Sequence, residues 1–267
     1  MEGDISKVLH WFDNEPSLWF VLTSSVHGDS HLSYTRVVVI TGEGRMFCAG
    51  ADLIAWNKRS EAGLLGDEGE SIISDTDGFG SISRRYSSSK PMIAAVNGGA
   101  YGGGMELIMN CDLVIAGENA KFAFPEVKRG VVAIQGGMRS YLLWNIDHLI
   151  GTTSNLLASE LLLLGRTITA TEAAIRFGFI NQVVPDDQVL QTALHWAADI
   201  NANSPDAVQS TKRALLLANR IASVEDVVVA HARSKETIRQ QTSTNIKEGL
   251  KAFTEKRRPV WTNPAKL

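Results

Sequence analysis

Cysteine, long apolar runs and an excess of positive charge are all scarce in this chain of 267 residues. Its two cysteines, Cys48 and Cys111, have neither metal-ligand spacing nor the pattern of a disulfide framework, which fits a reducing compartment. No apolar run approaches the roughly 18 residues that a membrane-spanning helix needs. A net charge of −3 without a basic block gives no electrostatic sign of nucleic-acid binding. The sequence therefore predicts a globular protein with no membrane span and no nucleic-acid partner.

Short apolar runs alternate with helical patterns, which is typical of an α/β fold. Strands are expected at Val37–Thr41, Pro91–Asn97, Leu113–Ala116, Lys121–Phe124 and Ile180–Val184. Residues 58–89 are polar and rich in Gly, Ser and Asp, and we expect a surface segment with some helix there. From about residue 152 the pattern becomes helical. These features predict a core over residues 1–185 and a helical region over residues 186–267.

Five glycines crowd into the stretch Asn97–Glu106 (NGGAYGGGME), directly after an expected strand. The stretch lacks the Lys-Ser/Thr pair of a phosphate loop and the spacing of a dinucleotide fingerprint, so a nucleotide site is not favoured. A glycine turn between a strand and a helix instead exposes backbone N–H groups that can stabilise an oxyanion. A second unit of this kind occurs at Phe47–Asp52. Together the two turns predict an oxyanion hole for a carbonyl group.

Two glutamates are expected beside these turns. Glu106 follows the glycines at the start of a helix, and Glu126 follows Pro125 after the next strand-like run. Each has a simpler interpretation: Glu106 as a carboxylate stabilised by the helix dipole, and Glu126 as a solvated turn residue. Because neighbouring parallel strands end at one edge of a sheet, we expect both carboxylates near the oxyanion hole, where they suit proton transfer next to a carbonyl.

These motifs resemble those of the crotonase family, also called the enoyl-CoA hydratase/isomerase family. The matching segments are FCAGADL at 47–53, KPMIAAVNGGAYGGGMELIMNCDLVIA at 90–116, KFAFPEVKRG at 121–130, ASELLLLGRTITATEAAIRFGFINQVV at 158–184 and EGLKAFTEKRRPVW at 248–261. The resemblance covers most of residues 37–267. It implies a crotonase-like ββα spiral with a C-terminal helical trimerisation region, and a homotrimer or hexamer.

The resemblance also assigns chemistry. It implies that the N–H groups of Ala51 and Gly103 bind the oxygen of an acyl-CoA thioester, which is the expected substrate and partner. Glu106 and Glu126 match the two acids of the hydratases, of which one takes a proton from water adding at C3 and the other protonates C2. In isomerases the acid at the position of Glu126 moves a proton between C2 and C4.

The remaining implied contacts are with CoA. Ala49, Asp52 and Leu53 match positions around the adenine and pantetheine, and Lys256 matches a lysine that meets CoA, often across a subunit contact. No metal or redox cofactor is expected, since CoA is part of the substrate and the six histidines are scattered along the chain.

The last three residues, Ala265-Lys266-Leu267, resemble the tripeptide that directs proteins to peroxisomes, although three residues can also match by chance. This predicts a peroxisomal enzyme recognised by the import receptor. The expected activity is enoyl-CoA hydratase, a lyase, or enoyl-CoA isomerase, in the metabolism of fatty acids or of a secondary-metabolite, toxin-type acyl chain. Thioester hydrolysis and dehydration of a hydroxyacyl-CoA are alternatives.

Three departures from the family pattern leave a further alternative open. The chain starts at about the first helix of the family, segment 20–36 resembles an insertion, and segment 138–157 is longer than usual. Ile134 also stands where many hydratases have a glycine. The alternative is a shortened, catalytically impaired member that binds CoA thioesters or serves as a partner subunit.

Overall fold

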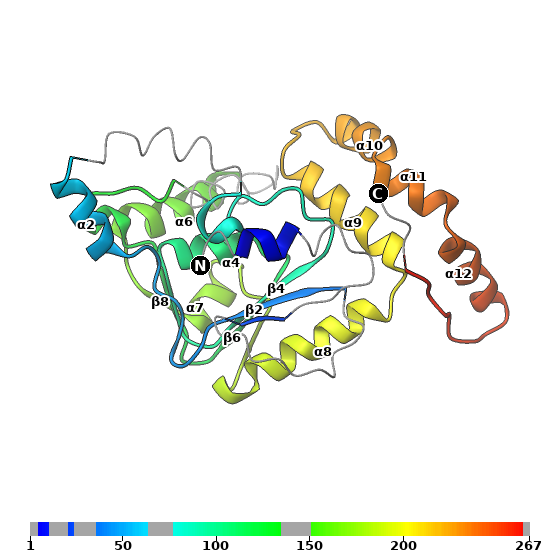
Figure 1. Ribbon diagram of the computed structural model, residues 1–267, viewed down its shortest axis with the longest axis horizontal. Helices are drawn as coiled ribbons and strands as arrows, with labels where there is room; N and C mark the ends of the chain where they lie inside the picture. The colour runs from blue at the N-terminus through cyan, green and yellow to red at the C-terminus, as the bar shows by residue number, and fades with distance from the viewer. Residues whose placement is uncertain (1–4, 11–20, 24–35, 64–76, 135–150, 264–267) are drawn as a thin grey trace.

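The computed structural model describes residues 5–10, 21–23, 36–63, 77–134 and 151–263 (Figure 1). Two sheets form the body of this part of the chain. The larger sheet is parallel throughout and has the order β1 (Val21–Thr23), β2 (Val38–Thr41), β4 (Met92–Val96), β6 (Leu113–Gly117) and β9 (Gln182–Val184). The smaller sheet has the order β3 (Met46–Cys48), β5 (Gly99–Tyr101), β7 (Lys121–Ala123) and β8 (Ile168–Thr169), with only β8 antiparallel to its neighbour.

The chain crosses from the larger to the smaller sheet three times in succession. Strand β2 leads to β3, β4 to β5 and β6 to β7, so the strands keep the same order in both sheets. A helical element follows each of the strands β3, β5 and β7: α2 (Leu53–Glu61), α4 (Gly103–Asn110) and the 3-10 turn η2 (Glu126–Arg129). This repeated strand–strand–helix unit is the ββα spiral that the sequence predicts.

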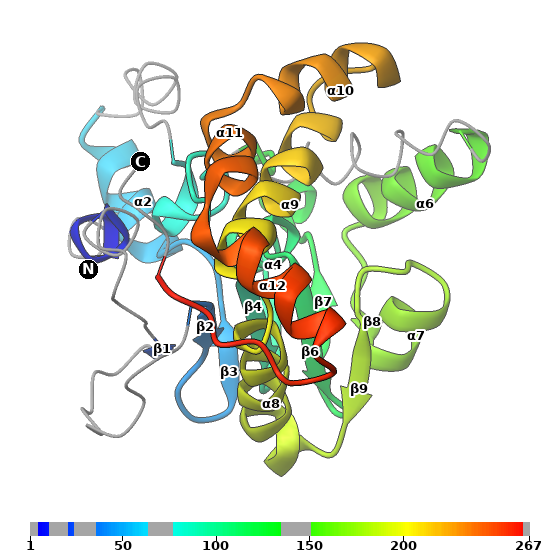
Figure 2. The same cartoon turned by 90° about the vertical axis from the view of Figure 1, so that its right-hand side faces the viewer.

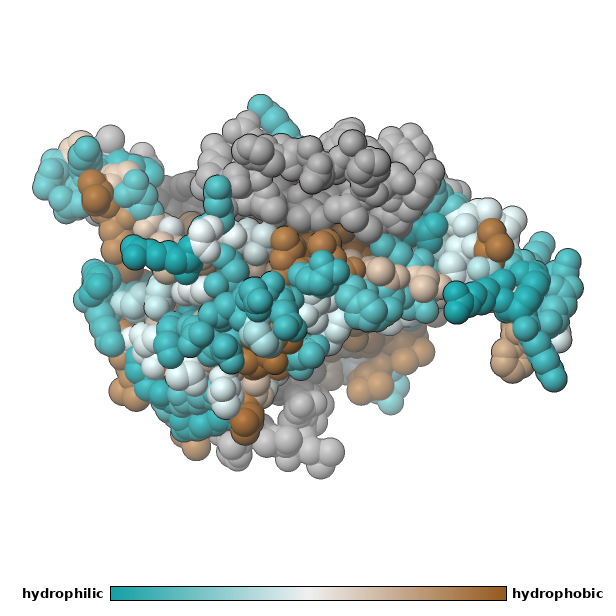
Figure 3. Space-filling view, turned by 90° about the horizontal axis from the view of Figure 1, so that it is seen from below, coloured by the Kyte–Doolittle hydropathy of each residue, from teal (hydrophilic) through white to brown (hydrophobic). Residues whose placement is uncertain are grey.

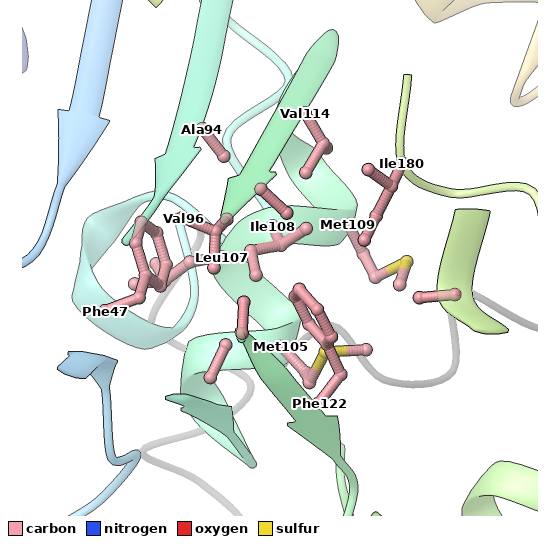
Figure 4. Packing of buried hydrophobic residues seen from close by; sticks show 14 of the residues in the cluster. Phe47, Ala94, Val96, Met105, Leu107, Ile108, Met109, Val114, Phe122 and Ile180 are labelled. Carbon is pink, nitrogen blue, oxygen red and sulfur yellow. The ribbon is translucent and has the colours of Figure 1, made fainter. Parts of the chain in front are cut away.

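The central strand β4 is buried along its whole length, because helices cover both faces of the sheet. Its alternate residues Ala94 and Val96 pack with α4 in one core cluster, seen in Figure 4 beside Met105 and Ile108. Ile93 belongs to a second cluster on the opposite face, which includes residues of α8 (Val189–Asn201). The period of two in β4 thus builds both layers of the core.

The C-terminal half is helical, as expected. After α6 (Gly151–Leu164) and α7 (Ala170–Ile175) come α8, α9 (Pro205–Ala218), α10 (Val224–Ala232), α11 (Lys235–Thr242) and α12 (Thr244–Thr254). Short 3-10 turns lie at η1 (Phe79–Ser81) and η3 (Asp186–Gln188). Figure 1 shows α10 to α12 reaching away from the sheets, with α12 and α2 at opposite ends of the molecule, and Figure 2 views the molecule from the end that carries α12.

A partly buried ion pair joins the helical region to the sheet. Lys212 of α9 is only 4% exposed, and its Nζ donates to Asp112 Oδ2 at 2.7 Å and to the carbonyl of Lys90 at 2.8 Å. Asp112 Oδ2 also accepts the N–H of Met92 at 2.7 Å. The start of β4 and the middle of α9 are therefore joined through one carboxylate.

Three segments differ from the sequence expectation. The glycine stretch Asn97–Glu106 was expected to be a single turn into a helix, but it contains strand β5. The polar segment 58–89 was expected at the surface, but Ser83, Arg85 and Ser88 are buried. Val21–Thr23, at the start of the expected insertion 20–36, pair with β2 as part of the larger sheet. Of the expected segment 138–157, residues before Gly151 lie outside the described residues.

Candidate active site

Three neighbouring strands of the smaller sheet end side by side, and a candidate residue follows each one. Ala51 comes after β3, Gly103 after β5 and Glu126 after β7. The strands are parallel, with Cys48 opposite Ala100 after a register shift between Met46 and Cys48, and with Tyr101 opposite Ala123. Their carboxyl ends therefore meet at one edge, which confirms the prediction of a shared edge.

The turns after β3 and β5 touch through their backbones. Gly50 has a φ of +90°, and an ideal Cβ built on it would lie 2.8 Å from the oxygen of Tyr101 and 3.3 Å from the nitrogen of Gly103. A larger residue could not be accommodated without moving one of the turns. This contact brings the backbone next to Ala51 against the backbone of Gly103.

Both candidate donors stand at the start of a helix. Gly103 is the first residue of α4, where a backbone N–H has no acceptor within the helix. Ala51 directly precedes Asp52, the N-cap of α2. The positive ends of two helix dipoles therefore face the same edge of the sheet, which favours negative charge on a bound oxygen.

The carboxylate of Glu126 lies against the glycine turn. Gly102 has a φ of 54°, and an ideal Cβ built on it would lie 2.9 Å from Glu126 Oε1. The N–H of Gly102 donates to the carbonyl of Ala123 at 3.0 Å, which holds the turn beside the end of β7. The missing side chain at Gly102 thus provides the space that Glu126 occupies.

Glu106 and Glu126 form a coupled pair. Glu106 lies in the first turn of α4 and is 4% exposed, and its N–H donates to the carbonyl of Gly102 at 3.1 Å. Burial raises the pKa of Glu126 to about 7, a hydrogen bond to its own backbone N–H opposes this rise, and the negative charge of Glu106 adds to it. Glu126 Oε2 is buried and has no hydrogen-bond partner among the residues that the structure describes.

These properties divide the two acids by role. Two nearby carboxylates cannot both ionise freely, and environments that push their pKa values apart assign one as acid and the other as base. Burial, with a smaller contribution from the charge of Glu106, raises the pKa of Glu126 and so favours its protonated form, which makes Glu126 the candidate acid. The arrangement can donate a proton from one side and accept one on the other.

Three of the residues predicted to contact CoA lie on either side of Ala51. Ala49 and Leu53 are exposed next to Ala51. Asp52 is exposed as well, but its carboxylate caps α2 by accepting the N–H groups of Ile54 and Ala55 at 3.0 Å each. A structural role therefore accounts for the acidic side chain at this position.

Lys256 is not brought to the other candidate residues within one chain. It is exposed, has a left-handed φ of 54° and follows α12 by two residues. Helix α12, which precedes Lys256, and helix α2, which follows Ala51, lie at opposite ends of the molecule in Figure 1.

Sequence reasoning missed Phe79 and the role of Gly102. Phe79 sits in the polar segment 58–89, but an ideal Cβ on Gly103 would lie 2.6 Å from its ring. The only sequence signal was an aromatic residue flanked by two glycines, Gly78 and Gly80. The sequence shows Gly102 as one of five clustered glycines, but no pattern indicates that it makes room for Glu126.

The described residues contain neither a metal-binding cluster nor a membrane-spanning helix. Among them, no cluster of three or more His, Cys, Asp or Glu side chains is arranged to hold a metal ion. No helix in the same part of the chain has the length and apolar character to cross a membrane.

Comparison with known proteins identifies a family. The family model described as enoyl-CoA hydratase/isomerase matches residues 25–264. The mevalonyl-coenzyme A hydratase SIDH of Beauveria bassiana is 39% identical over 98% of this chain and 84% of its own length. The mevalonyl-coenzyme A hydratase sidH of Aspergillus fumigatus is 36% identical over 99% of this chain and 85% of its own length.

Solved structures agree with the sequence comparison. The crystal structure of the enoyl-CoA hydratase EchA1 from Mycobacterium marinum superposes with a TM-score of 0.74 at 32% identity. The alignment covers 97% of this chain and 87% of that one. Both the family match and the shared fold therefore extend over nearly all of the chain.

Proposed function

The chain belongs to the enoyl-CoA hydratase/isomerase family, and we propose that it catalyses the reversible addition of water to the 2,3 double bond of a 2-enoyl-CoA thioester through Glu106 and Glu126. Hydratase-type lyase activity on acyl-CoA follows from the family and its relatives. The observation that supports these residue roles is the position of the Glu126 carboxylate against Gly102, one residue from the candidate donor Gly103.

The two backbone donors act on the thioester oxygen. As water adds to C3, the electrons of the double bond move onto the thioester and its oxygen becomes an enolate oxyanion. The N–H groups of Ala51 and Gly103 stabilise this charge, and the two helix N-termini add to the effect. Donors of this kind are already oriented in the folded protein, so little reorganisation is needed during the reaction.

The two glutamates move the protons. Ionised Glu106 accepts a proton from the water whose oxygen bonds to C3, and protonated Glu126 gives its proton to C2 of the enolate. After one turnover Glu106 carries a proton and Glu126 is ionised, so the pair still holds one proton in total. Dehydration of a 3-hydroxyacyl-CoA uses the same steps in reverse.

A short, branched acyl chain is the substrate that the relatives favour. Two relatives of 36% and 39% identity are named as mevalonyl-coenzyme A hydratases. A mevalonyl thioester carries both a hydroxyl and a methyl group on C3, and loss of that hydroxyl with a C2 proton gives a 2-enoyl thioester. Of the two pathways that the sequence left open, fatty-acid metabolism and the metabolism of a specialised acyl chain, this substrate class favours the second.

The C-terminal helices provide the surface for the proposed homotrimer or hexamer. Val228, Ile238, Leu250 and Phe253 are all more than half exposed, and Phe253 reaches 85%. Figure 3 shows hydrophobic side chains among hydrophilic ones at the end of the molecule that carries α12. Covering these side chains in an oligomer would also bring Lys256 near a partner, and a monomer in sedimentation equilibrium would contradict this.

Peroxisomal import stays a prediction from the sequence, because Ala265-Lys266-Leu267 lie outside the described residues. We propose that the tripeptide is recognised by the import receptor. Deleting it from a fluorescent fusion should move the protein from peroxisomes to the cytosol, and an unchanged distribution would refute the proposal.

Purified protein should hydrate a four-carbon 2-enoyl-CoA and should dehydrate mevalonyl-CoA. Loss or gain of absorbance from the conjugated thioester measures both reactions. A 3-enoyl-CoA of equal length is the matched control, since its turnover requires proton transfer between C2 and C4. Migration of its double bond without any hydration would identify the chain as an isomerase and contradict the proposed hydratase activity. Absence of turnover with every thioester would also contradict the proposed function.

A further inference from the structure

We propose that Phe79 forms a wall of the acyl-chain site and limits the width of the acyl group that this enzyme accepts. The inference rests on the proposed function, because it uses the thioester position defined by Gly103. Phe79 carries no titratable or nucleophilic group, so its proposed role rests on its packing and on the backbone conformation around it.

The ring of Phe79 covers the first residue of α4. An ideal Cβ on Gly103 would lie 2.6 Å from both Cδ1 and Cε1 of Phe79, which is closer than any side chain tolerates. Gly103 is the candidate donor to the thioester oxygen, and Glu106 lies one turn further along the same helix. An acyl chain whose carbonyl binds Gly103 therefore starts beside this ring.

Packing against the core holds the ring of Phe79, which is not fully buried. Phe79 is partly buried and packs against the main core cluster, which contains Leu107 of α4. An ideal Cβ on the adjacent Gly80 would meet Leu107 Cδ2 at 3.1 Å, so the turn is pressed closely onto the helix. The exposed part of the ring is a rigid apolar surface, which is the chemistry that contacts a hydrocarbon chain.

The backbone around Phe79 is held in an unfavourable conformation. Gly78, Gly80 and Ser81 have φ values of 71°, 62° and 56°. Ser81 is one of only two non-glycine residues with positive φ in the described part of the chain, and such a conformation costs about 1–2 kcal/mol. Strain of this kind persists where surrounding structure enforces it, and it concentrates at functional sites.

Specific contacts enforce the turn. The carbonyl of Asp77 accepts the N–H of Arg84 at 2.8 Å, and its carboxylate pairs with buried Arg85 at 2.8 Å. Asn110 at the end of α4 donates its side-chain N–H to the carbonyl of Ile82. The turn is thereby closed on itself and attached to α4 at a point beyond the ring, so the position of Phe79 is fixed relative to Gly103.

A fixed wall next to the reacting carbons limits the width of the acyl group that can bind there. A hydrophobic pocket discriminates about 10–200-fold for one methylene group, because an oversized group must displace packed atoms. Removing the ring should therefore favour wider acyl groups over a linear four-carbon chain. Enlarging it should have the opposite effect.

The test compares kcat/KM for 3-methyl-2-butenoyl-CoA, which is wider at C3, and linear 2-butenoyl-CoA in the native protein, Phe79→Ala, Phe79→Leu and Phe79→Trp. The ratio of branched to linear substrate should rise about tenfold or more in Phe79→Ala, rise less in Phe79→Leu, and fall in Phe79→Trp. The conservative leucine variant keeps most of the packing and gives a result even where alanine prevents folding.

Ile175→Ala is the control, because this apolar side chain is 82% exposed and lies on α7, outside the proposed site and the proposed oligomer surface. Its ratio should equal that of the native protein. Equal ratios in folded Phe79→Leu and Phe79→Trp would overturn the inference and leave Phe79 as a packing residue. Absence of turnover already in the native protein would overturn the proposed function, and this inference with it.

Discussion

Replacing Glu126 with glutamine is expected to lower kcat for hydration by about 10²- to 10⁴-fold, the range supplied by a positioned general acid. Glutamine keeps the shape of the side chain, and so the space beside Gly102 stays filled. It cannot deliver a proton to C2, because its amide is not acidic. Steady-state rates with a four-carbon 2-enoyl-CoA measure this loss.

The same substitution should stabilise the folded protein at alkaline pH. The pKa of Glu126 is raised from 4.5 to about 7, mainly by burial. An acid with a raised folded-state pKa contributes stability that is complete below about pH 4.5 and is lost as the pH rises through about 7. Glutamine avoids this loss, so at about pH 8 the variant should gain about 1–2 kcal/mol, a value reduced for partial solvent screening.

Two controls separate this effect from general damage. Glu118→Gln removes an exposed carboxylate after β6 and should change neither the rate nor the melting temperature. Glu106→Gln should reduce hydration more than double-bond migration, since only hydration needs a base for water. A Glu126→Gln variant with native activity, or with equal destabilisation at about pH 5 and pH 8, would contradict the assigned role.

Replacing Ala51 with proline should lower kcat by about 10²- to 10³-fold, because proline has no N–H to donate to the oxyanion. The side chain of Ala51 is exposed, so a larger residue has room there. The helix α2 begins two residues later with its cap at Asp52, and its capping bonds to Ile54 and Ala55 do not involve Ala51. The rate with a 2-enoyl-CoA and the melting temperature should be measured together.

Ala51→Ser is the control, because serine keeps the backbone N–H and is only slightly larger than alanine. It should retain most of the activity. If the proline variant stayed folded and lost less than about threefold in kcat, Ala51 would not be a donor to the developing oxyanion. Equal losses in the serine variant would indicate crowding by the side chain instead.

The sequence predicts the parts of this site that depend on local pattern. Glycines after a strand predict exposed N–H groups near Gly103, and an acid in the first helical turn predicts Glu106. The apolar runs also locate β2, β4 and β6 correctly, since each is long enough and continuous enough to show its burial. These features need no knowledge of distant contacts.

Other features arise only from tertiary structure. Strand β5 has three residues and begins at a glycine, so it shows no strand propensity, and it forms because β3 and β7 lie on either side of it. Phe79 is positioned by left-handed backbone and by the Asp77–Arg85 pair, neither of which has a periodic signature.

The pH dependence of kcat/KM in both reaction directions tests the central claim most directly, because the claim is that Glu106 and Glu126 share one proton. Burial places the pKa of Glu126 at about 7, so kcat/KM should fall above about pH 7, by up to about tenfold per pH unit, as the pair loses that proton. Hydration releases no net proton, so dehydration should show the same midpoint. A kcat/KM for hydration that stayed constant from about pH 6 to pH 9 would contradict the account.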